Sequence, residues 1–307
     1  MTRTRFLGPV GTFTQVAAQH WAGIDGELEP MTELRQVYES VENESCDFGV
    51  VAIENSVEGY VVPSLDLLLN SNVVAVDEFQ VPITFDAFVL PDCPDVPHVV
   101  VSHPHALAQC GRFIQEVGVP VRPATSTAAA CRDLKPGEIG IGPNVCGDMY
   151  GLRTLRSAVE DYSGARTRFL LLTDRTTARE RIRGMAAQPA AHMMIAATPQ
   201  VTGPGVLARL ATCFADRGIN LTSLISRPLK GHESKYCFVL TLGGHPQNAM
   251  VRGALEELLA AGDVVKTLGV FESFPSLAAS DLVPVAPKGS ARIASSTEAL
   301  DEALLWG

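Results

Sequence analysis

Short apolar runs alternate with longer amphipathic stretches over residues 1–173. Each apolar run is typical of a buried strand, and small polar residues separate it from a stretch with helical spacing. Examples are "TRFLG" before "PVGTFTQVAAQHWA", "FGVVAIENS" before "VEGYVVPSLDLLL", and the continuous segment "HVVVSHPHALAQCGRFIQEV". Alternating strands and helices predict an α/β fold with a mainly parallel sheet and helices on both faces.

Polar residues precede several of the expected helices and can cap them. Thr12 and Gln15 have the spacing of a capping box, in which the two side chains satisfy free backbone amides at the helix start. Ser102 and the run 125–127 stand at corresponding places before two further helices. Because ligands bind outside the carboxyl ends of strands in such sheets, these junctions predict a surface suited to carboxylates or phosphates.

A second pattern begins near residue 190. It follows a charged and then small-residue segment at 174–190, which is expected to be a linker with one helical turn. Residues 190–275 then read as strand, helix, strand, strand, helix, strand, which is the ferredoxin-like βαββαβ order. Residues 276–307 are rich in Ala, Ser and Pro, and we expect them to form a flexible tail.

Composition and charge narrow the class of protein. The 307 residues are 46% hydrophobic and 19% charged, which is typical of globular chains and long enough for two domains. A formal net charge of −10 argues against nucleic acid or a membrane as partner. No stretch approaches the roughly 20 apolar residues that cross a bilayer. Seven scattered cysteines and the absence of a signal-peptide core predict reduced thiols and a cytoplasmic location.

The strongest candidates for chemistry lie in "SGARTRFLLL", where Thr167 and Arg168 stand at the start of an apolar strand. A guanidinium there must reach solvent, pair with an acid or bind an anionic ligand. Glu160 or Asp161 could supply an ion pair, so spacing alone leaves the role of Arg168 open.

Other catalytic patterns are weak in this sequence. His103 and His105 are two residues apart with no further ligand nearby in sequence, so no metal site is predicted. The glycine-containing segments lack the spacing of nucleotide-binding loops, and Ser56 lacks the flanking glycines of a nucleophile elbow. Taken singly, the hydroxyl residues at the junctions are ordinary helix caps. Their collective position at strand ends is what indicates a site.

Five motifs, in this order, resemble those of the prephenate dehydratase family: "FLGPVGTFTQVAAQ", "VVAIENSVEGYVVPSLDLL", "SHPHALAQC", "TSTAAA" and "GARTRFLLL". "GPGVLARL" with "GINLTSLISRP" resembles the regulatory ACT domain of that family. The resemblance covers about residues 4–275. It implies two α/β lobes of the periplasmic-binding-protein type around a cleft, followed by a ferredoxin-like (βαββαβ) ACT domain.

The resemblance also implies domain boundaries. The catalytic domain is expected at 1–182, with lobe one at about 1–78 plus 159–182 and lobe two at about 79–158. The ACT domain is expected at 190–275.

The implied activity is the decarboxylative dehydration of prephenate to phenylpyruvate in phenylalanine biosynthesis, without a metal or an organic cofactor. Feedback regulation by phenylalanine and a homodimer or tetramer are implied as well. Thr167 matches the family's catalytic threonine, a hydroxyl that donates to the departing oxygen, and Arg168 is expected to bind carboxylate. The implied substrate-binding residues are Thr12, Asn55, Ser56, Ser126, Thr127 and Phe169. The implied effector-binding residues are Gly203, Gly205, Val206, Leu207, Ser226, Arg227 and Pro228.

The sequence departs from the family pattern at four positions. Ala52 replaces a proline, Ser64 a threonine and His105 a glutamine. Ile225 replaces the glutamate that begins the effector motif, so the second domain either binds an effector or serves only dimerisation. Three other functions stay open: action on arogenate, decarboxylation of prephenate without aromatisation, and a non-catalytic small-molecule sensor.

Overall fold

The computed structural model describes residues 2–23, 26–91, 96–185, 191–229, 236–272, 290 and 303–305. By contacts the chain divides into a unit at Met1–Ser273 and a second unit at Phe274–Gly307. Apart from residues 290 and 303–305, the tail predicted at 276–307 lies outside the described residues, as does the last part of the predicted linker, 186–190. The elements below all belong to the first unit.

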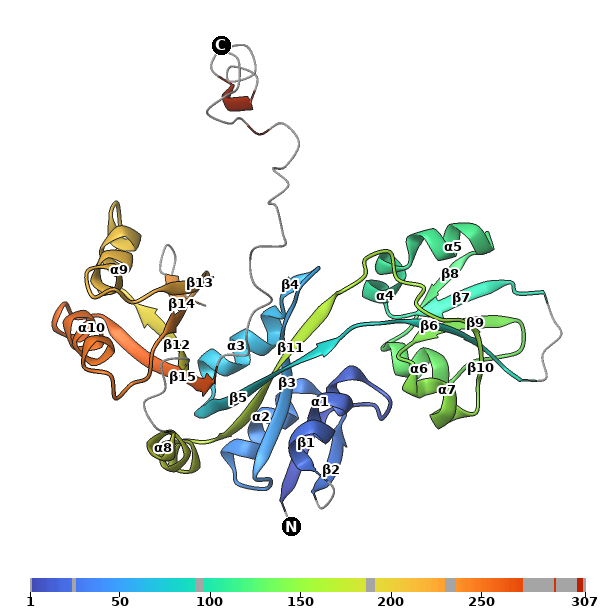
Figure 1. Cartoon of the computed structure of the whole chain (residues 1–307), viewed down its shortest axis with the longest axis horizontal. Coiled ribbons are helices and arrows are strands. Elements are labelled where there is room, and N and C mark those ends of the chain that lie inside the picture. The colour runs from blue at the N-terminus through green and yellow to red at the C-terminus, as the bar shows by residue number, and fades with distance from the viewer. Residues whose placement is uncertain are drawn as a thin grey trace. The chain divides into compact units, whose positions relative to one another are not determined.

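One long sheet runs through this unit in the order β13-β14-β12-β15-β5-β11-β3-β1-β2, with β4 paired to β3. Figure 1 shows its long strands β5 and β11 side by side at the centre. The strands of its N-terminal part are β1 (Arg3–Leu7), β2 (Glu27–Met31), β3 (Phe48–Asn55), β4 (Gly59–Tyr60), β5 (Val73–Pro82) and β11 (Arg166–Asp174). The accompanying helices are α1 (Phe13–Ala22), α2 (Leu34–Glu42), α3 (Val62–Asn70) and α8 (Arg175–Gly184).

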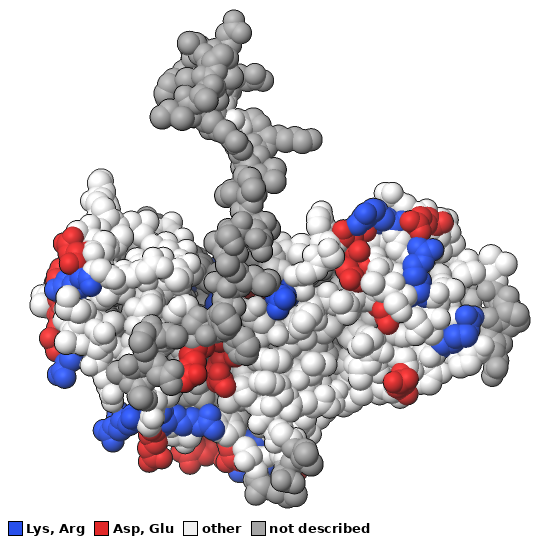
Figure 2. Space-filling view, viewed as in Figure 1, with Lys and Arg blue, Asp and Glu red and all other residues white. Residues whose placement is uncertain are grey.

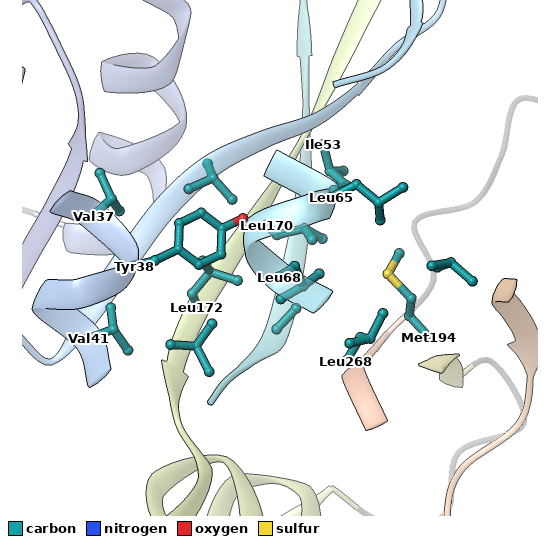
Figure 3. Close-up of a cluster of buried hydrophobic side chains, with 14 of the residues drawn as sticks. Val37, Tyr38, Val41, Ile53, Leu65, Leu68, Leu170, Leu172, Met194 and Leu268 are labelled. Atoms are coloured by element: carbon teal, nitrogen blue, oxygen red, sulfur yellow. The ribbon is translucent and has the colours of Figure 1, made fainter. Parts of the chain in front are cut away.

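Two apolar clusters hold these helices on opposite faces of the sheet. Leu170 and Leu172 of β11 pack against α2 and α3, whereas Phe169 and Leu171 pack against α1 and α8. The alternation follows from the period of two along a strand. Figure 3 shows Tyr38 and Leu68 from α2 and α3 meeting Leu170 and Leu172.

A smaller sheet of five strands forms the second lobe, in the order β10-β6-β9-β7-β8. Its strands are β6 (Asp86–Val89), β7 (Val99–Ser102), β8 (Val121–Pro123), β9 (Glu138–Gly142) and β10 (Arg153–Arg156). Its helices are α4 (Pro104–Gln109), α5 (Gly111–Val117), α6 (Thr127–Arg132) and α7 (Val145–Tyr150). The chain enters this lobe between β5 and β6 and returns to the first between β10 and β11.

The prediction of two α/β lobes is confirmed, but the sheets are less parallel than predicted. Pairs β1–β2, β1–β3, β7–β8 and β7–β9 are parallel. Strand β11 is antiparallel to both β3 and β5, and β6 is antiparallel to β9 and β10. The physical reason is that strands which carry the chain between lobes run in opposite senses on the outward and return passes.

The C-terminal region has the predicted βαββαβ order. Its elements are β12 (Ala191–Thr198), α9 (Val206–Ala215), β13 (Leu221–Pro228), β14 (Tyr236–Gly243), α10 (Ala249–Ala260) and β15 (Val264–Glu272). One face of its sheet packs against α9 and α10. Met194 and Leu268 on the other face join the cluster around α3 (Figure 3).

The segment before this region is more ordered than predicted. A linker with one helical turn was expected at 174–190, but residues 175–184 form the ten-residue helix α8. Asp174 caps it by accepting hydrogen bonds from the backbone amides of Thr176 and Thr177. Arg and Glu have high helix propensity, so a good cap is enough to extend the single predicted turn.

Within the described residues, no helix is long and apolar enough to cross a membrane. On the face drawn in Figure 2, basic and acidic side chains lie beside one another in mixed clusters. The described part of that face carries no continuous basic surface.

Candidate active site

The end of β3 and the start of β11 place the two residues at the centre of the site. Asn55 and Thr167 are cross-strand partners, and Asn55 Nδ2 donates to Thr167 Oγ1 at 2.9 Å. Asn55 Oδ1 accepts from the backbone amides of Val57 and Glu58 at 2.8 and 3.1 Å. Both ends of the Asn55 amide are therefore held, and its orientation fixes the threonine hydroxyl.

Ser56 fixes the chain just after β3 to the start of β11, but it does not line the cavity described below. Its Oγ accepts from the Arg166 amide at 2.9 Å, and its own amide donates to the Arg166 carbonyl at 2.9 Å. These two bonds lock the turn after β3 against β11. Ser56 is thus placed as a support of Thr167.

A cavity of about 610 Å³ opens beside Thr167. Residues of both lobes line it: β3, β4, β11 and α1 contribute residues from the first lobe, and α4 and α6 contribute residues from the second. Its lining residues are Thr12, Phe13, Thr14, Ala52, Asn55, Glu58, Gly59, Tyr60, Val61, Val62, Pro63, Ile83, Phe85, His103, His105, Ala106, Gln109, Thr127, Thr167 and Phe169.

The loop before α1 is held against the second lobe. Tyr150 Oη donates to the Val10 carbonyl at 2.7 Å, and Cys146 Sγ donates to the Gly11 carbonyl at 3.5 Å. Gly11 has φ +88°, and a Cβ atom there would lie 3.1 Å from Tyr150 Oη. Only glycine fits this positive φ and close approach comfortably. Thr12, the N-cap of α1, consequently faces the cavity.

The helix caps confirm two sequence predictions and correct a third. Thr12 and Ser126 are the N-caps of α1 and α6. The predicted cap of α4 at Ser102 is wrong, because the N-cap is His103. Pro104 begins that helix, which makes the preceding residue the cap, and Ser102 Oγ instead donates to the Ile141 carbonyl in the core.

Arg168 lies on the opposite face of β11 from Thr167 and does not line the cavity. Its guanidinium pairs with Glu54 at 2.9 Å and with buried Glu78 at 3.6 Å. It also donates to Tyr60 Oη at 3.3 Å. The candidate partners named from sequence, Glu160 and Asp161, bind backbone amides in the second lobe instead.

No residue of the described cavity lining is a lysine or an arginine. Glu58 is its one carboxylate, and His103 and His105 are its only basic side chains. Burial lowers the pKa of His103, with a further contribution from His105. His103 Nδ1 accepts from the His105 amide at 3.3 Å, which places the proton of the neutral ring on Nε2. The cavity therefore offers mainly neutral hydrogen-bond donors.

The structure brings together five of the eight predicted catalytic and substrate residues: Thr12, Asn55, Thr127, Thr167 and Phe169. Sequence reasoning assigned no site role to Tyr60, Gln109 or Phe85, which also line the cavity. Tyr60 stands close after the "IENS" motif, which was the available signal. Phe85 and Gln109 carry no local pattern that marks a site.

The predicted effector residues occupy two separate places in one chain. Gly203, Gly205 and Val206 line a cavity of about 410 Å³ together with Arg209 and Asp263. Leu207 is exposed on α9. Ser226 and Pro228 are exposed on β13, which lies at one end of the long sheet. Arg227 points to the other face and pairs with Asp66 of α3.

The described residues contain no group of three or more His, Cys, Asp or Glu side chains that could hold a metal ion. All six described cysteines are free and buried.

Comparison with known proteins gives matches over both halves of the chain. A family model for prephenate dehydratase matches residues 4–177, and one for the ACT domain matches residues 202–260. The prephenate dehydratase of Amycolatopsis methanolica is 34% identical over 285 residues and 91% of each chain. That of Bacillus subtilis strain 168 is 29% identical over 88% of this chain and 98% of its own.

Solved structures agree with these sequence matches. The prephenate dehydratase of Arthrobacter aurescens in complex with L-Phe has a TM-score of 0.79 and 28% identity, covering 99% of this chain and 98% of that one. The enzyme of Staphylococcus aureus has a TM-score of 0.74 and 27% identity, covering 88% and 100%. The similarity thus includes the cavity and the βαββαβ region.

Proposed function

The chain belongs to the prephenate dehydratase family, and we propose that the cavity beside Thr167 is where it converts prephenate to phenylpyruvate. In this reaction the bond to one carboxylate breaks and releases carbon dioxide. Its electron pair enters the ring as the ring hydroxyl departs, and one proton turns that hydroxyl into water. Aromatisation supplies the driving force, so the protein has to hold the substrate and assist the leaving group.

The observation that carries this proposal is the hydrogen bond from Asn55 Nδ2 to Thr167 Oγ1. An amide NH₂ group can only donate, so Thr167 accepts from Asn55 and keeps its own proton for another partner. Thr167 is 9% exposed and lines the cavity. Its O–H is a positioned donor for the departing oxygen, and a donor held in place without reorganisation is worth most where water is excluded.

Recognition of the two substrate carboxylates is assigned to neutral donors. Thr12 and Thr127 line the cavity from opposite lobes, and Phe169 supplies an apolar wall for the ring. Ser56 and Ser126 support these groups from just outside the cavity, through the hairpin and the α6 cap. Arg168 also stays outside the cavity, and we assign it a positioning role on β11.

Phenylalanine is the effector that we propose for the ACT domain. The similarity to the Arthrobacter aurescens enzyme in complex with L-Phe supports this assignment. Gly203, Gly205 and Arg209 line one cavity, while Ser226 and Pro228 are exposed on the edge strand β13. Two copies joined along this edge would bring the two segments together, so we propose a homodimer or a dimer of dimers.

The free cysteines fit the reducing cytoplasm that we propose as the enzyme's location. Ile225 supplies no charge to the effector site. Two alternatives therefore remain: an enzyme regulated by phenylalanine, and an enzyme whose ACT domain serves only assembly.

Phenylpyruvate formation from prephenate by the purified chain, with and without phenylalanine, tests the function directly. Turnover suppressed by phenylalanine is expected. Turnover that is unaffected by phenylalanine would support the proposed activity and contradict the proposal that phenylalanine is the effector. A product without aromatic absorbance would indicate decarboxylation alone, and preferential turnover of arogenate would change the substrate. Binding of prephenate without any product would favour a sensor.

A further inference from the structure

Tyr60 connects the cavity to the ACT domain through one hydroxyl group. Tyr60 is one of the residues that line the cavity, and its Oη lies 2.8 Å from Ser223 Oγ on β13. Arg168 Nη2 donates to the same Oη at 3.3 Å, and the Arg168 guanidinium lies over the Tyr60 ring at 5.9 Å. Tyr60 therefore touches substrate space, the residue after Thr167, and the ACT sheet.

Chemistry fixes the direction of the hydrogen bond between Arg168 and Tyr60. A guanidinium has no acceptor, so the Tyr60 oxygen must accept from Arg168. Its single proton is then available for Ser223 Oγ. The carboxylates of Glu54 and Glu78 hold Arg168 from the other side. The tyrosine hydroxyl thus sits between an anchored cation and a serine of another domain.

Strand pairing links Tyr60 to the residues that hold Thr167. Tyr60 is paired with Glu54, and Gly59 with Asn55, in the two-residue strand β4. Asn55 is the donor to Thr167 Oγ1. Asn55 Oδ1 accepts from the amides of Val57 and Glu58 in the turn between β3 and β4, so a shift of β4 would move the groups that orient the Asn55 amide.

Strand β13 is well placed to hold Tyr60 still. Its inward side chains alternate with exposed ones, and the inward set is Ser223, Ile225 and Arg227. Ile225 packs against the cluster around α3. Arg227 forms a bidentate pair with Asp66 of α3 at 2.9 and 3.0 Å. Ser223 is thereby part of a docked face rather than of a free edge.

A second strand of the ACT domain fixes the far end of α3. Lys266 Nζ on β15 donates to the carbonyls of Leu69 and Leu68 at 2.7 and 3.2 Å, and to that of Ser71 at 2.5 Å. These are carbonyls at the helix C-terminus, which lack partners within the helix. The ACT sheet consequently contacts α3 at its middle, through Asp66, and at its C-terminal end, and α3 begins two residues after Tyr60.

From these contacts we propose that Tyr60 is a positioning residue for the dehydratase reaction, held in place by Ser223 of the ACT domain. The inference rests on the proposed function of the cavity. It assigns to β13 a contribution to turnover that is separate from effector binding, since Ser223 contacts Tyr60 of the catalytic lobe while Ser226 is exposed.

Four variants of the full chain test the proposal: Tyr60→Phe, Ser223→Ala, the double variant, and Thr222→Ala as matched control. Thr222→Ala removes a hydroxyl from the adjacent, exposed position, where it donates to the Thr241 carbonyl. Ser223→Ala should lower kcat roughly fivefold, the usual worth of one neutral hydrogen bond, and Tyr60→Phe at least as much, because it also removes the hydrogen bond from Arg168. KM for prephenate should change less than kcat, and Thr222→Ala should behave as wild type.

The double variant decides whether the two hydroxyls act together. A kcat equal to that of Tyr60→Phe is expected, since Ser223→Ala removes only a hydrogen bond that Tyr60→Phe already removes. Multiplied effects, or unchanged kcat in the single variants, would overturn the proposal. Ser223→Thr keeps the hydroxyl and should restore turnover.

Hydrogen exchange separates this proposal from the proposed function. Faster exchange of the amides around 54–60 is expected in Ser223→Ala and not in Thr222→Ala, whether or not the protein turns prephenate over. If the wild type shows no turnover, the proposed function fails, and the exchange experiment still reports on the contact. Equal exchange in both variants would show that Ser223 does not hold β4.

Discussion

The two faces of β11 differ sharply in their chemistry although their residues are neighbours in sequence. Thr167 and Phe169 face a cavity whose described lining holds no lysine or arginine and whose donors are mainly neutral. Arg168 faces a group of charged and hydrogen-bonding side chains that reaches the ACT domain through Tyr60 and Ser223. From this comparison we expect changes on the cavity face to affect turnover directly and changes on the charged face to affect stability and the position of Tyr60.

The largest expected effect comes from the cavity face. Thr167→Ala removes the proposed donor to the leaving group and should lower kcat by about 10²- to 10³-fold, as loss of one preorganised donor does elsewhere. Thr167→Ser keeps the hydroxyl and should retain most of the activity. Phenylpyruvate absorbance gives kcat, and circular dichroism checks the fold. Equal kcat in wild type and Thr167→Ala would remove the hydroxyl from the mechanism.

Arg168→Leu tests the charged face. Loss of the guanidinium beside Glu54 and buried Glu78 should cost about 3 kcal/mol of the free energy of unfolding. Arg168→Lys should recover only part of this, because an ammonium cannot reach the two carboxylates and Tyr60 with one planar fork. Urea unfolding measures the change. A variant of normal stability that has lost turnover would place Arg168 in the chemistry instead.

Buried Asp263 forms a separate ion pair with Arg209, in the cavity that Gly203 and Gly205 line. It accepts from Arg209 at 2.9 Å and from the Gln200 amide at 3.1 Å. Burial raises its pKa, but the hydrogen bonds from Arg209 and Gln200 outweigh burial, so the net pKa is lowered. Asp263→Asn should cost about 2 kcal/mol of stability at neutral pH, the worth of a charged hydrogen bond.

The pH dependence of this stability difference follows from the direction of the pKa shift of Asp263. Because the pKa is lower in the folded state, the ionised carboxylate stabilises the protein above the unfolded value of about 3.9. This contribution disappears as pH falls through the folded-state pKa. Thermal unfolding of wild type and Asp263→Asn should therefore differ at neutral pH and converge in acid. A difference that persists unchanged in strong acid would contradict the ion pair as its source.

Much of the fold was predictable because local patterns agreed with it. The apolar run at 169–172 predicted β11, and the βαββαβ order predicted the C-terminal domain. The family motifs predicted Thr167 and Asn55, which meet across 112 residues. The antiparallel placement of β11 between β3 and β5 was not predictable, since it depends on how the chain leaves and re-enters the first lobe.

The position of Arg168 shows where sequence reasoning stopped. Alternation along a strand puts Thr167 and Arg168 on opposite faces. Which face borders the cavity depends on partners far away in sequence, namely Glu78 and Tyr60. The contact between Tyr60 and Ser223 spans 163 residues and two domains. Both residues lie within quoted family motifs, but neither motif indicates that the two side chains meet.

The smallest expected effect concerns His103, a residue of the cavity lining whose substitution should change stability through the cap of α4. His103 caps α4 by accepting from the His105 amide, and burial lowers its pKa. His103→Ala should cost about 1 kcal/mol of stability, the usual worth of an N-cap. His103→Asn should cost less, because Asn has an acceptor at a similar position and is a favoured cap.

Protonation should produce the same loss as the alanine variant. A histidine whose folded-state pKa is lowered stabilises the protein above its unfolded value, 6.5, and that contribution fades as pH falls. The stability gap between wild type and His103→Asn should therefore narrow or reverse in mild acid, since Asn does not titrate. Thermal unfolding at pH 7.5 and in mild acid measures it, with wild type and variant compared at each pH. If the gap is independent of pH, the His103 ring is not held as a neutral acceptor, and the cavity face is less neutral than its lining indicates.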